Sequence, residues 1–168
     1  MRLHRSSKGV RLAWLAALGL PIALAAAPAR ADGSATCAIS ATPLVFGQYV
    51  PYDGAPADFT ATITVTCTSP GGAPVPIHGS ISLAGPGAPS ARELTDGPNR
   101  LRYQLFLDPS RTIPWGDGSG GSDRSFSGVV SPAAPFKETV TVYARILARQ
   151  SGAMVGSYTS QIVVVLNY

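Results

Sequence analysis

Several features are scarce or absent in this 168-residue chain, and their absence excludes a usual zinc site, a helical fold and a membrane-spanning segment after residue 31. Lysine occurs only at Lys8 and Lys137, and cysteine and histidine occur twice each. One of the histidines, His4, lies in a segment that we expect to be removed, so too few ligands remain for a usual structural zinc site. After residue 31 no segment has a helical hydrophobic period, and no apolar run is long enough to cross a bilayer.

The first 31 residues have the features of a secretory signal peptide. A positively charged start, Arg2–Arg11, precedes the apolar segment Leu12–Ala27 and an Ala-x-Ala motif at Ala29–Ala31. We therefore expect cleavage after Ala31, which divides the chain into a signal peptide (1–31) and a mature domain (32–168). The alternative, an uncleaved membrane anchor, is disfavoured because the apolar run is short, is interrupted by Pro21 and is followed directly by Pro28.

Removal of residues 1–31 reverses the sign of the net charge. The whole chain carries a formal charge of +4, but five of its 13 basic residues lie within residues 1–31 and all nine acidic residues lie within residues 32–168. The mature domain therefore has eight basic and nine acidic residues, a net charge of −1. This excludes a basic stripe for nucleic acid and a polybasic patch for a membrane surface.

The two cysteines, Cys37 and Cys67, both lie in the part of the chain that we expect to be exported. An even number of cysteines in an oxidising compartment predicts one disulfide. Closing a loop of about 30 residues would stabilise the fold by roughly 3–4 kcal/mol in the chain-entropy model. A redox role is disfavoured because the cysteines are not in a C-x-x-C arrangement.

The mature domain is rich in Gly, Pro, Ser and Thr and contains many short alternating segments, which predicts an all-β sandwich or barrel. The clearest strand is Phe59–Thr68, in which apolar residues alternate with five threonines. Its apolar face, which includes Cys67, is expected to point into the core, and Cys37 is expected on a neighbouring first strand. The other predicted strands are Thr36–Ala41, Val45–Tyr49, Ile77–Ala84, Asn99–Asp108, Ser125–Val130, Glu138–Arg149 and the C-terminal segment Ser157–Tyr168.

The C-terminal strand is strongly apolar and ends the chain without a turn. Ile162, Val164 and Leu166 fall on one face of this strand. A long apolar strand is normally paired on both edges or covered, because an open edge recruits other chains. The pattern alone leaves two interpretations open: an ordinary central strand of a complete sandwich, or an edge that receives a strand from another protein.

A series of short motifs runs in order along the mature domain. The motifs are Cys37–Ser40, Phe46–Tyr49, Ile63–Cys67, Arg92–Leu94, Leu101–Asp108, Trp115–Gly118, Val142–Tyr143, Gly156–Tyr158 and the final strand to Tyr168. In this order and spacing the mature chain resembles the spore coat U domain family, secreted pilin subunits of archaic chaperone–usher pili in Gram-negative bacteria.

The resemblance implies an immunoglobulin-like β-sandwich that lacks its last strand and is completed by donor-strand complementation. In the family, a periplasmic chaperone lends a strand, and at an outer-membrane usher the next pilin subunit replaces it. The product is a cell-surface pilus for adhesion and biofilm formation, with no catalytic activity and no cofactor. By resemblance, the acceptor groove for the chaperone or donor strand is expected at Ile39, Ile162, Val164 and Leu166, and the chaperone is expected to grip the carboxylate of Tyr168.

One feature departs from the family. Only Asp32–Thr36 precedes Cys37, and five residues span at most about 18 Å with no large apolar side chain. We expect a subunit that accepts a donor strand but cannot give one, which would place it at the tip or as an initiating or capping subunit. A mature start near Leu18, which would keep Leu20 and other apolar residues as a donor segment, would contradict this expectation.

Other interpretations are weaker. A Ser-His-Asp triad would have to use His78, which lies on a predicted strand. The loop Asp117–Asp123 suggests calcium but lacks the EF-hand spacing, so a flexible turn is favoured. Trp115 is expected to be a hydrophobic plug over one end of the sandwich, with an exposed aromatic contact as the alternative. A self-sufficient secreted adhesin or lectin-like module remains an alternative function, and a spore or cyst coat component is a third.

Overall fold

The computed structural model describes residues 34–168, which form an antiparallel β-sandwich. The expected signal peptide lies outside the described residues. The strands are β1 (Thr36–Ala41), β2 (Ala57–Thr68), β3 (Val75–Ala84), β4 (Arg92–Asp96), β5 (Asn99–Phe106), β6 (Arg124–Val130), β7 (Phe136–Ile146) and β8 (Val163–Asn167). The described part has one further element, the single 3-10 turn η1 (Ser119–Gly121), and in it no helix is long and apolar enough to span a membrane.

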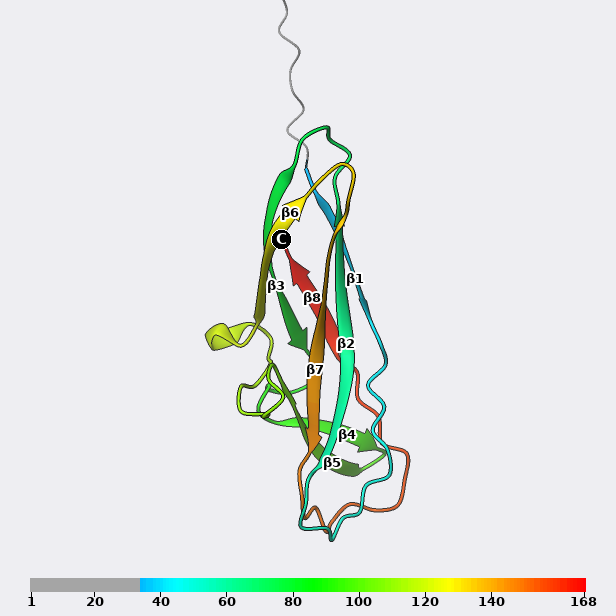
Figure 1. Cartoon of the computed structure of the whole chain (residues 1–168). Helices are drawn as coiled ribbons and strands as arrows, with labels where there is room; N and C mark the ends of the chain where they lie inside the picture. Colours follow the sequence, from blue (N-terminus) through cyan, green and yellow to red (C-terminus); the bar gives the residue numbers. More distant parts are fainter. Residues whose placement is uncertain (1–33) are drawn as a thin grey trace, which may run out of the picture. The chain divides into compact units, whose positions relative to one another are not determined.

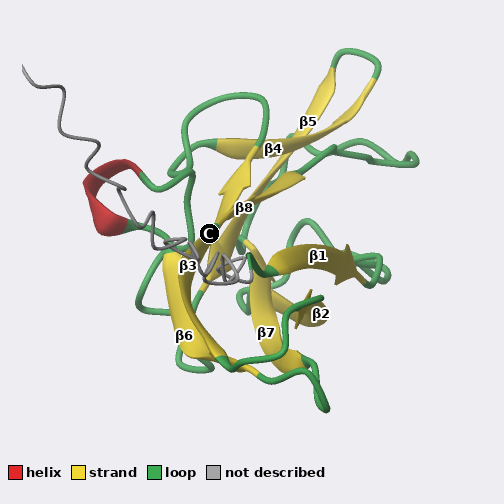
Figure 2. Cartoon of the chain, turned by 90° about the horizontal axis from the view of Figure 1, so that it is seen from above, coloured by secondary structure: helices red, strands yellow, loops and turns green. Residues whose placement is uncertain are grey.

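The strands form two sheets, and within each sheet all neighbouring strands pair in the antiparallel direction. The first sheet has the order β1-β2-β7-β5-β4, and the second has the order β6-β3-β8 (Figure 1). Viewed from above, β1, β2, β7, β6, β3 and β8 follow one another around the interior (Figure 2). The all-β sandwich predicted from the sequence is confirmed.

The core forms from the inward faces of alternating strands. In β2, the side chains of Ala61, Ile63, Val65 and Cys67 are buried and the intervening threonines are not, as their alternation predicts. The same alternation buries one face of β3, β5 and β7. The core residues that these strands contribute are Ile77, Ile81, Leu83, Leu101, Tyr103, Leu105, Val140, Val142, Ala144 and Ile146.

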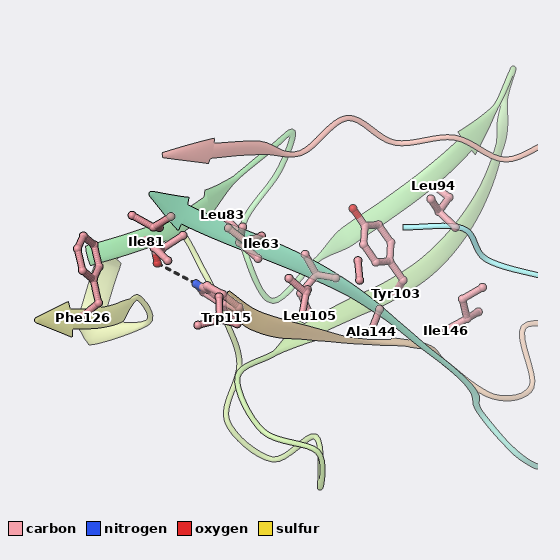
Figure 3. Packing of buried hydrophobic residues seen from close by; sticks show 14 of the residues in the cluster. Ile63, Ile81, Leu83, Leu94, Tyr103, Leu105, Trp115, Phe126, Ala144 and Ile146 are labelled. Carbon is pink, nitrogen blue, oxygen red and sulfur yellow. Dashed lines mark hydrogen bonds between the residues drawn. The ribbon is translucent and has the colours of Figure 1, made fainter. Parts of the chain in front are cut away.

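Trp115 fills the middle of the sandwich. It is 0% exposed, and its indole Nε1 donates a 2.9 Å hydrogen bond to the main-chain oxygen of Ile81 in β3 (Figure 3). The guanidinium of Arg92, 3% exposed, donates hydrogen bonds to the main-chain oxygens of Leu83 and Trp115. Trp115 is therefore buried, as the plug interpretation predicts, but it lies between the two sheets rather than over one end of the sandwich, and the exposed alternative is wrong.

The sequence prediction and the structure differ at two places between residues 45 and 96. Residues 45–49 are not a strand: the chain leaves β2 after Thr42, and Phe46 instead packs edge-to-face against Phe59 and Tyr103. The strand β4 was not predicted from its pattern. Its buried positions are Arg92 and Leu94, so its sequence shows no apolar alternation.

The predicted C-terminal strand is two separate pieces. Thr159 pairs with Thr95 of β4 in the first sheet, and β8 then pairs with β3 in the second sheet. The chain between them crosses from one sheet to the other. A continuous strand over residues 157–168 is therefore wrong, because a strand that changes sheets has to leave its first partner. The ends of the other predicted strands differ by at most a few residues.

Candidate functional site

The two edges β1 and β8 are the walls of the candidate site. In the described part of the chain, β1 pairs only with β2, and β8 pairs only with β3. β8 runs toward the end of the sandwich at which β1 begins (Figure 1). Each strand thus leaves a row of main-chain N–H and C=O groups without a strand partner among the described residues. An extended segment of another chain can add to such an open edge as a further strand.

A cavity of about 420 Å³ opens between these two walls. Its β1 side is the end of that strand and the segment after it, Ala41–Phe46, without Pro43. Its β8 side consists of Ile162 and Val164 with the preceding residues Tyr158–Ser160. Its floor is apolar and reaches through the sandwich to β4 and β5: Ala61, Ile63, Leu83, Leu94, Tyr103, Leu105 and Val142.

The inward side chains of both walls are less buried than those of the neighbouring strands. Ile39 of β1 and Val164 of β8 are half-buried and pack against the core. Their partners across the ladder, Val65 and Leu83, are buried. An apolar side chain that points inward yet remains half-exposed indicates that this side of the sandwich has an incomplete cover.

A disulfide fixes the β1 wall to the sandwich. Cys37 and Cys67 are opposite each other in the β1–β2 ladder and are bonded, as predicted. Cys67 is completely buried. Among residues 34–168, β1 pairs with β2 alone, so this covalent bond adds a constraint on its position that a second neighbouring strand would otherwise provide.

The lining of the cavity contains no ionisable carboxylate, amine, guanidinium or imidazole. Its polar groups are hydroxyls, and two of them pair with each other: Tyr103 and Ser160, with 3.2 Å between their oxygens. On the rim, the Thr42 hydroxyl accepts a 2.9 Å hydrogen bond from the Thr62 main-chain N–H. A site of this chemistry suits an uncharged apolar peptide segment rather than a charged ligand.

The structure brings some of the predicted site residues together and separates others. Ile162 and Val164 line the cavity. Ile39 and Leu166 are half-buried against the core but are not among the lining residues. Tyr168 lies exposed at the chain end, where it borders two other depressions together with His78.

Sequence reasoning missed the segment after β1 as part of the wall. Leu44 and Phe46 line the cavity from a loop, as does Tyr158 on the opposite side. The only available signal was the motif Phe46–Tyr49, which the sequence analysis interpreted as a strand. A loop residue that folds back over the end of a sandwich leaves no periodic trace in the sequence.

The sites considered as weaker alternatives gain no support from the described residues. No group of three His, Cys, Asp or Glu between residues 34 and 168 is arranged to hold a metal ion. The carboxylate of Asp117 instead accepts hydrogen bonds from the hydroxyl and the main-chain N–H of Ser119, which lower its pKa. These contacts describe a turn that is closed by its own side chains.

Comparison with models of protein families identifies the family to which this chain belongs. The family model of the Spore Coat Protein U domain matches residues 23–165. The chain belongs to this family. The match begins before the expected cleavage point at Ala31 and covers every described strand up to the middle of β8. No curated protein matches the chain.

A solved structure has the same fold as this member of the Spore Coat Protein U domain family. It is the CsuC-CsuE chaperone-tip adhesion subunit pre-assembly complex from archaic chaperone-usher Csu pili of Acinetobacter baumannii. The identity is 18% and the TM-score is 0.54, over 80% of this chain and 40% of that chain. The chain thus spans less than half the length of its structural neighbour, and the likeness establishes the fold.

Proposed function

We propose that this chain is a structural subunit of an archaic chaperone–usher pilus, assembled by donor-strand complementation. The observation that carries the proposal is the apolar cavity between β1 and β8, two strands that have no strand partner among the described residues on the side facing it. An inserted strand would provide main-chain hydrogen bonds to the edges and alternate side chains for the cavity. Membership of the Spore Coat Protein U domain family supports this role over a catalytic one.

The expected gain from an inserted strand is large compared with the stability of a domain. Burying about five apolar side chains contributes roughly 1.5–3 kcal/mol each. A whole domain is stable by about 5–15 kcal/mol. The joined subunit and donor would therefore separate very slowly, as a fibre exposed to mechanical load requires.

The proposed partners are a periplasmic chaperone, an outer-membrane usher and other pilin subunits. The structural neighbour is a complex of a chaperone with a tip adhesion subunit, which supports the first of these. The chain would pass through the periplasm and be displayed on the cell surface. We propose that the pilus serves adhesion and biofilm formation.

We also propose that the chain occupies the tip or caps the fibre. The predicted mature segment before Cys37 is too short and too polar to fill a groove. Apolar side chains are also exposed on the loops that join β1 to β2 and β7 to β8: Val50, Tyr52, Met154 and Val155. Loops of this composition suit the free end of a fibre, where contact with a surface occurs.

The proposal is tested by thermal unfolding of the oxidised, exported chain with and without a peptide of alternating apolar residues. We expect a weak transition and self-association alone, and a cooperative monomeric transition with the peptide. The variant Val164→Arg should lose the response, because Val164 lines the cavity. The matched control Val163→Arg changes the neighbouring residue, which is 53% exposed, and should keep it. A cooperative transition that the peptide does not affect would favour a self-sufficient adhesin or lectin-like module.

A further inference from the structure

We infer that the acceptor groove has two sections of unequal depth, so that the donor strand needs its large apolar side chains in only one half of its length. This inference rests on the proposed function, because it takes the occupant to be a donor strand. It adds to that function a requirement on the partner's sequence. The deep section is defined by Ala41, Ile162 and Val164, and the shallow section by Ile39 and Leu166.

The strand registers locate the boundary between the two sections. Across β1 and β2, Ala41 lies opposite Ile63, and Ile39 lies opposite Val65. The cavity is lined by Ile63 but not by Val65, so on this wall it ends between the two levels. Residue Val65, just past that end, is fully buried.

The other wall gives the same boundary independently. Across β3 and β8, Val164 lies opposite Leu83, and Leu166 lies opposite Ile81. Leu83 and Val164 line the cavity, whereas Ile81 and Leu166 do not. Both walls thus end this cavity at a single level of the sandwich.

Trp115 accounts for the difference in depth. Its side chain is fully buried and bonded to the main-chain oxygen of Ile81, so the largest core side chain occupies the interior beside the shallow section (Figure 3). On the other side of the boundary, the cavity extends from Leu83 in the second sheet to Leu94 and Tyr103 in the first sheet. A cavity of about 150 Å³ admits a benzene ring, so the 420 Å³ of the deep section has room for two or three large side chains.

The shallow section leaves less space for the donor. Ile39 and Leu166 pack against the core and, unlike Ile162 and Val164, do not line the cavity, so an inserted residue would cover them from outside rather than enter between the sheets. Small residues such as alanine or serine would suffice at these positions, with affinity coming from the main-chain hydrogen bonds. The donor is therefore an extended segment with two or three bulky alternate residues at one end and small alternate residues at the other.

Four synthetic peptides test this inference on the oxidised, exported chain. Each peptide has about 12 residues, in which threonine alternates with positions whose side chains point into the groove. These inward positions carry isoleucine throughout, only in the N-terminal half, only in the C-terminal half, or nowhere. Alanine occupies the inward positions that do not carry isoleucine. We expect one half-filled peptide to bind within about threefold of the full peptide and the other at least about tenfold more weakly. The peptide that binds well also reports the direction of insertion.

Two outcomes of the peptide series contradict the inference in different ways. Equal affinities of the two half-filled peptides, with strong binding of the full peptide, would overturn the unequal depth but leave the proposed function intact. Failure of the full peptide to bind at all would overturn the proposed function and this inference with it.

Substitutions in the walls assign the preferred half to the deep section. Ala61→Leu adds a larger side chain to the floor of the cavity, and Ala41→Leu adds one at its exposed rim. Both substitutions should weaken the binding of the better half-filled peptide at least about tenfold, and should change the affinity of the weaker peptide by less than about threefold. The matched control Ala38→Leu adds the same atoms to the exposed face of β1 and should change neither. If Ala41→Leu, which is the variant least able to disturb folding, leaves both affinities unchanged, the inference fails.

Discussion

The indole Nε1 of Trp115 donates a hydrogen bond of 2.9 Å to the main-chain oxygen of Ile81. This bond ties the long connection between β5 and β6 to the middle strand of the second sheet. The main-chain N–H of Trp115 donates in turn to the oxygen of Leu105 in the first sheet. One residue from a connecting segment therefore joins the two layers of the sandwich.

Trp115→Phe should destabilise the domain by about 1–3 kcal/mol, because the oxygen of Ile81 is left buried without its donor. The measurement is the free energy of unfolding in urea, made on the peptide-complemented protein so that the transition is cooperative. The control Tyr52→Phe changes an exposed side chain and should stay within about 0.5 kcal/mol of the parent. A Trp115→Phe protein as stable as the control would show that the bond contributes nothing.

Arg92→Met should also destabilise the domain, by about 2–4 kcal/mol. The guanidinium of Arg92 is buried and donates to the main-chain oxygens of Pro89, Leu83 and Trp115. Burial lowers the pKa of this arginine, but the group remains charged at any pH used for unfolding. Methionine fills a similar volume without donors, so three acceptors from three segments would lose their partner.

The matched control for this change is Arg100→Met. Arg100 is exposed, donates hydrogen bonds to the main-chain oxygens of Gly97 and Asn99 in its own hairpin, and lies 3.7 Å from the carboxylate of Glu93. We expect a change below about 0.5 kcal/mol in the same urea experiment. Equal effects of the two arginine variants would mean that the buried network is not a source of stability.

The sequence predicted the strands in which apolar and polar residues alternate. It failed where a strand has a buried charged residue or where the strand changes its partner. β2 and β7 carry long alternating runs and were predicted within a few residues. β4 was missed because one of its two inward positions is the buried Arg92, which no pattern of apolar residues anticipates. The C-terminal segment was predicted as one strand because alternation continues through the crossing between Thr159 and Val163, although its partner changes.

Reduction of the disulfide between Cys37 and Cys67 should lower stability by about 3–4 kcal/mol. It should also release β1 in preference to the other strands, because β1 has strand partners on one side only. Hydrogen exchange of the Ser40 amide, which has the same orientation toward β2 as the bonded Thr42 amide, compared with that of Val65, measures this directly. If both amides lose protection equally, the bond stabilises the whole sandwich rather than one wall of the site.

Stability should fall in acid through Asp58. Its carboxylate accepts bonds of 2.7 and 2.8 Å from Arg145 and lies 3.3 Å from Arg111. The bond from Arg145 and the charges of both arginines outweigh partial burial and lower the pKa of Asp58 below 3.8. Because the folded pKa is below the unfolded one, this contribution is present above about pH 4 and is lost as the pH falls through the folded value.

Asp58→Asn should therefore cost about 0.5–1 kcal/mol at neutral pH and close to nothing near pH 2. The estimate is small because the Asp58 side chain is 35% exposed and solvent screens the pair. Urea unfolding of the variant and the parent at both pH values gives the difference. Glu93→Gln, which breaks a longer and more exposed pair with Arg100, is the control. A cost that is the same at both pH values would point to packing rather than charge.

The candidate site could be predicted in part. Ile162 and Val164 were identified because alternation places them on the inward face of a strand, which is a local property. The loop wall, Leu44 and Phe46, could not be found in this way, since its position depends on where the chain turns after β1. The unequal depth of the groove depends on Trp115, a residue from a connection whose packing is set by both sheets together.

The pairing of β8 with β3 imposes an order in time. Ser80 pairs with Asn167, so the second sheet of the described residues lacks one of its three strands until the chain has been made to residue 167. Such distant pairings form late, after the local hairpins. A copy that ends before residue 163 has no β8 and lacks one wall of the cavity. The site that we assign to a partner strand is therefore finished after the rest of the sandwich has formed.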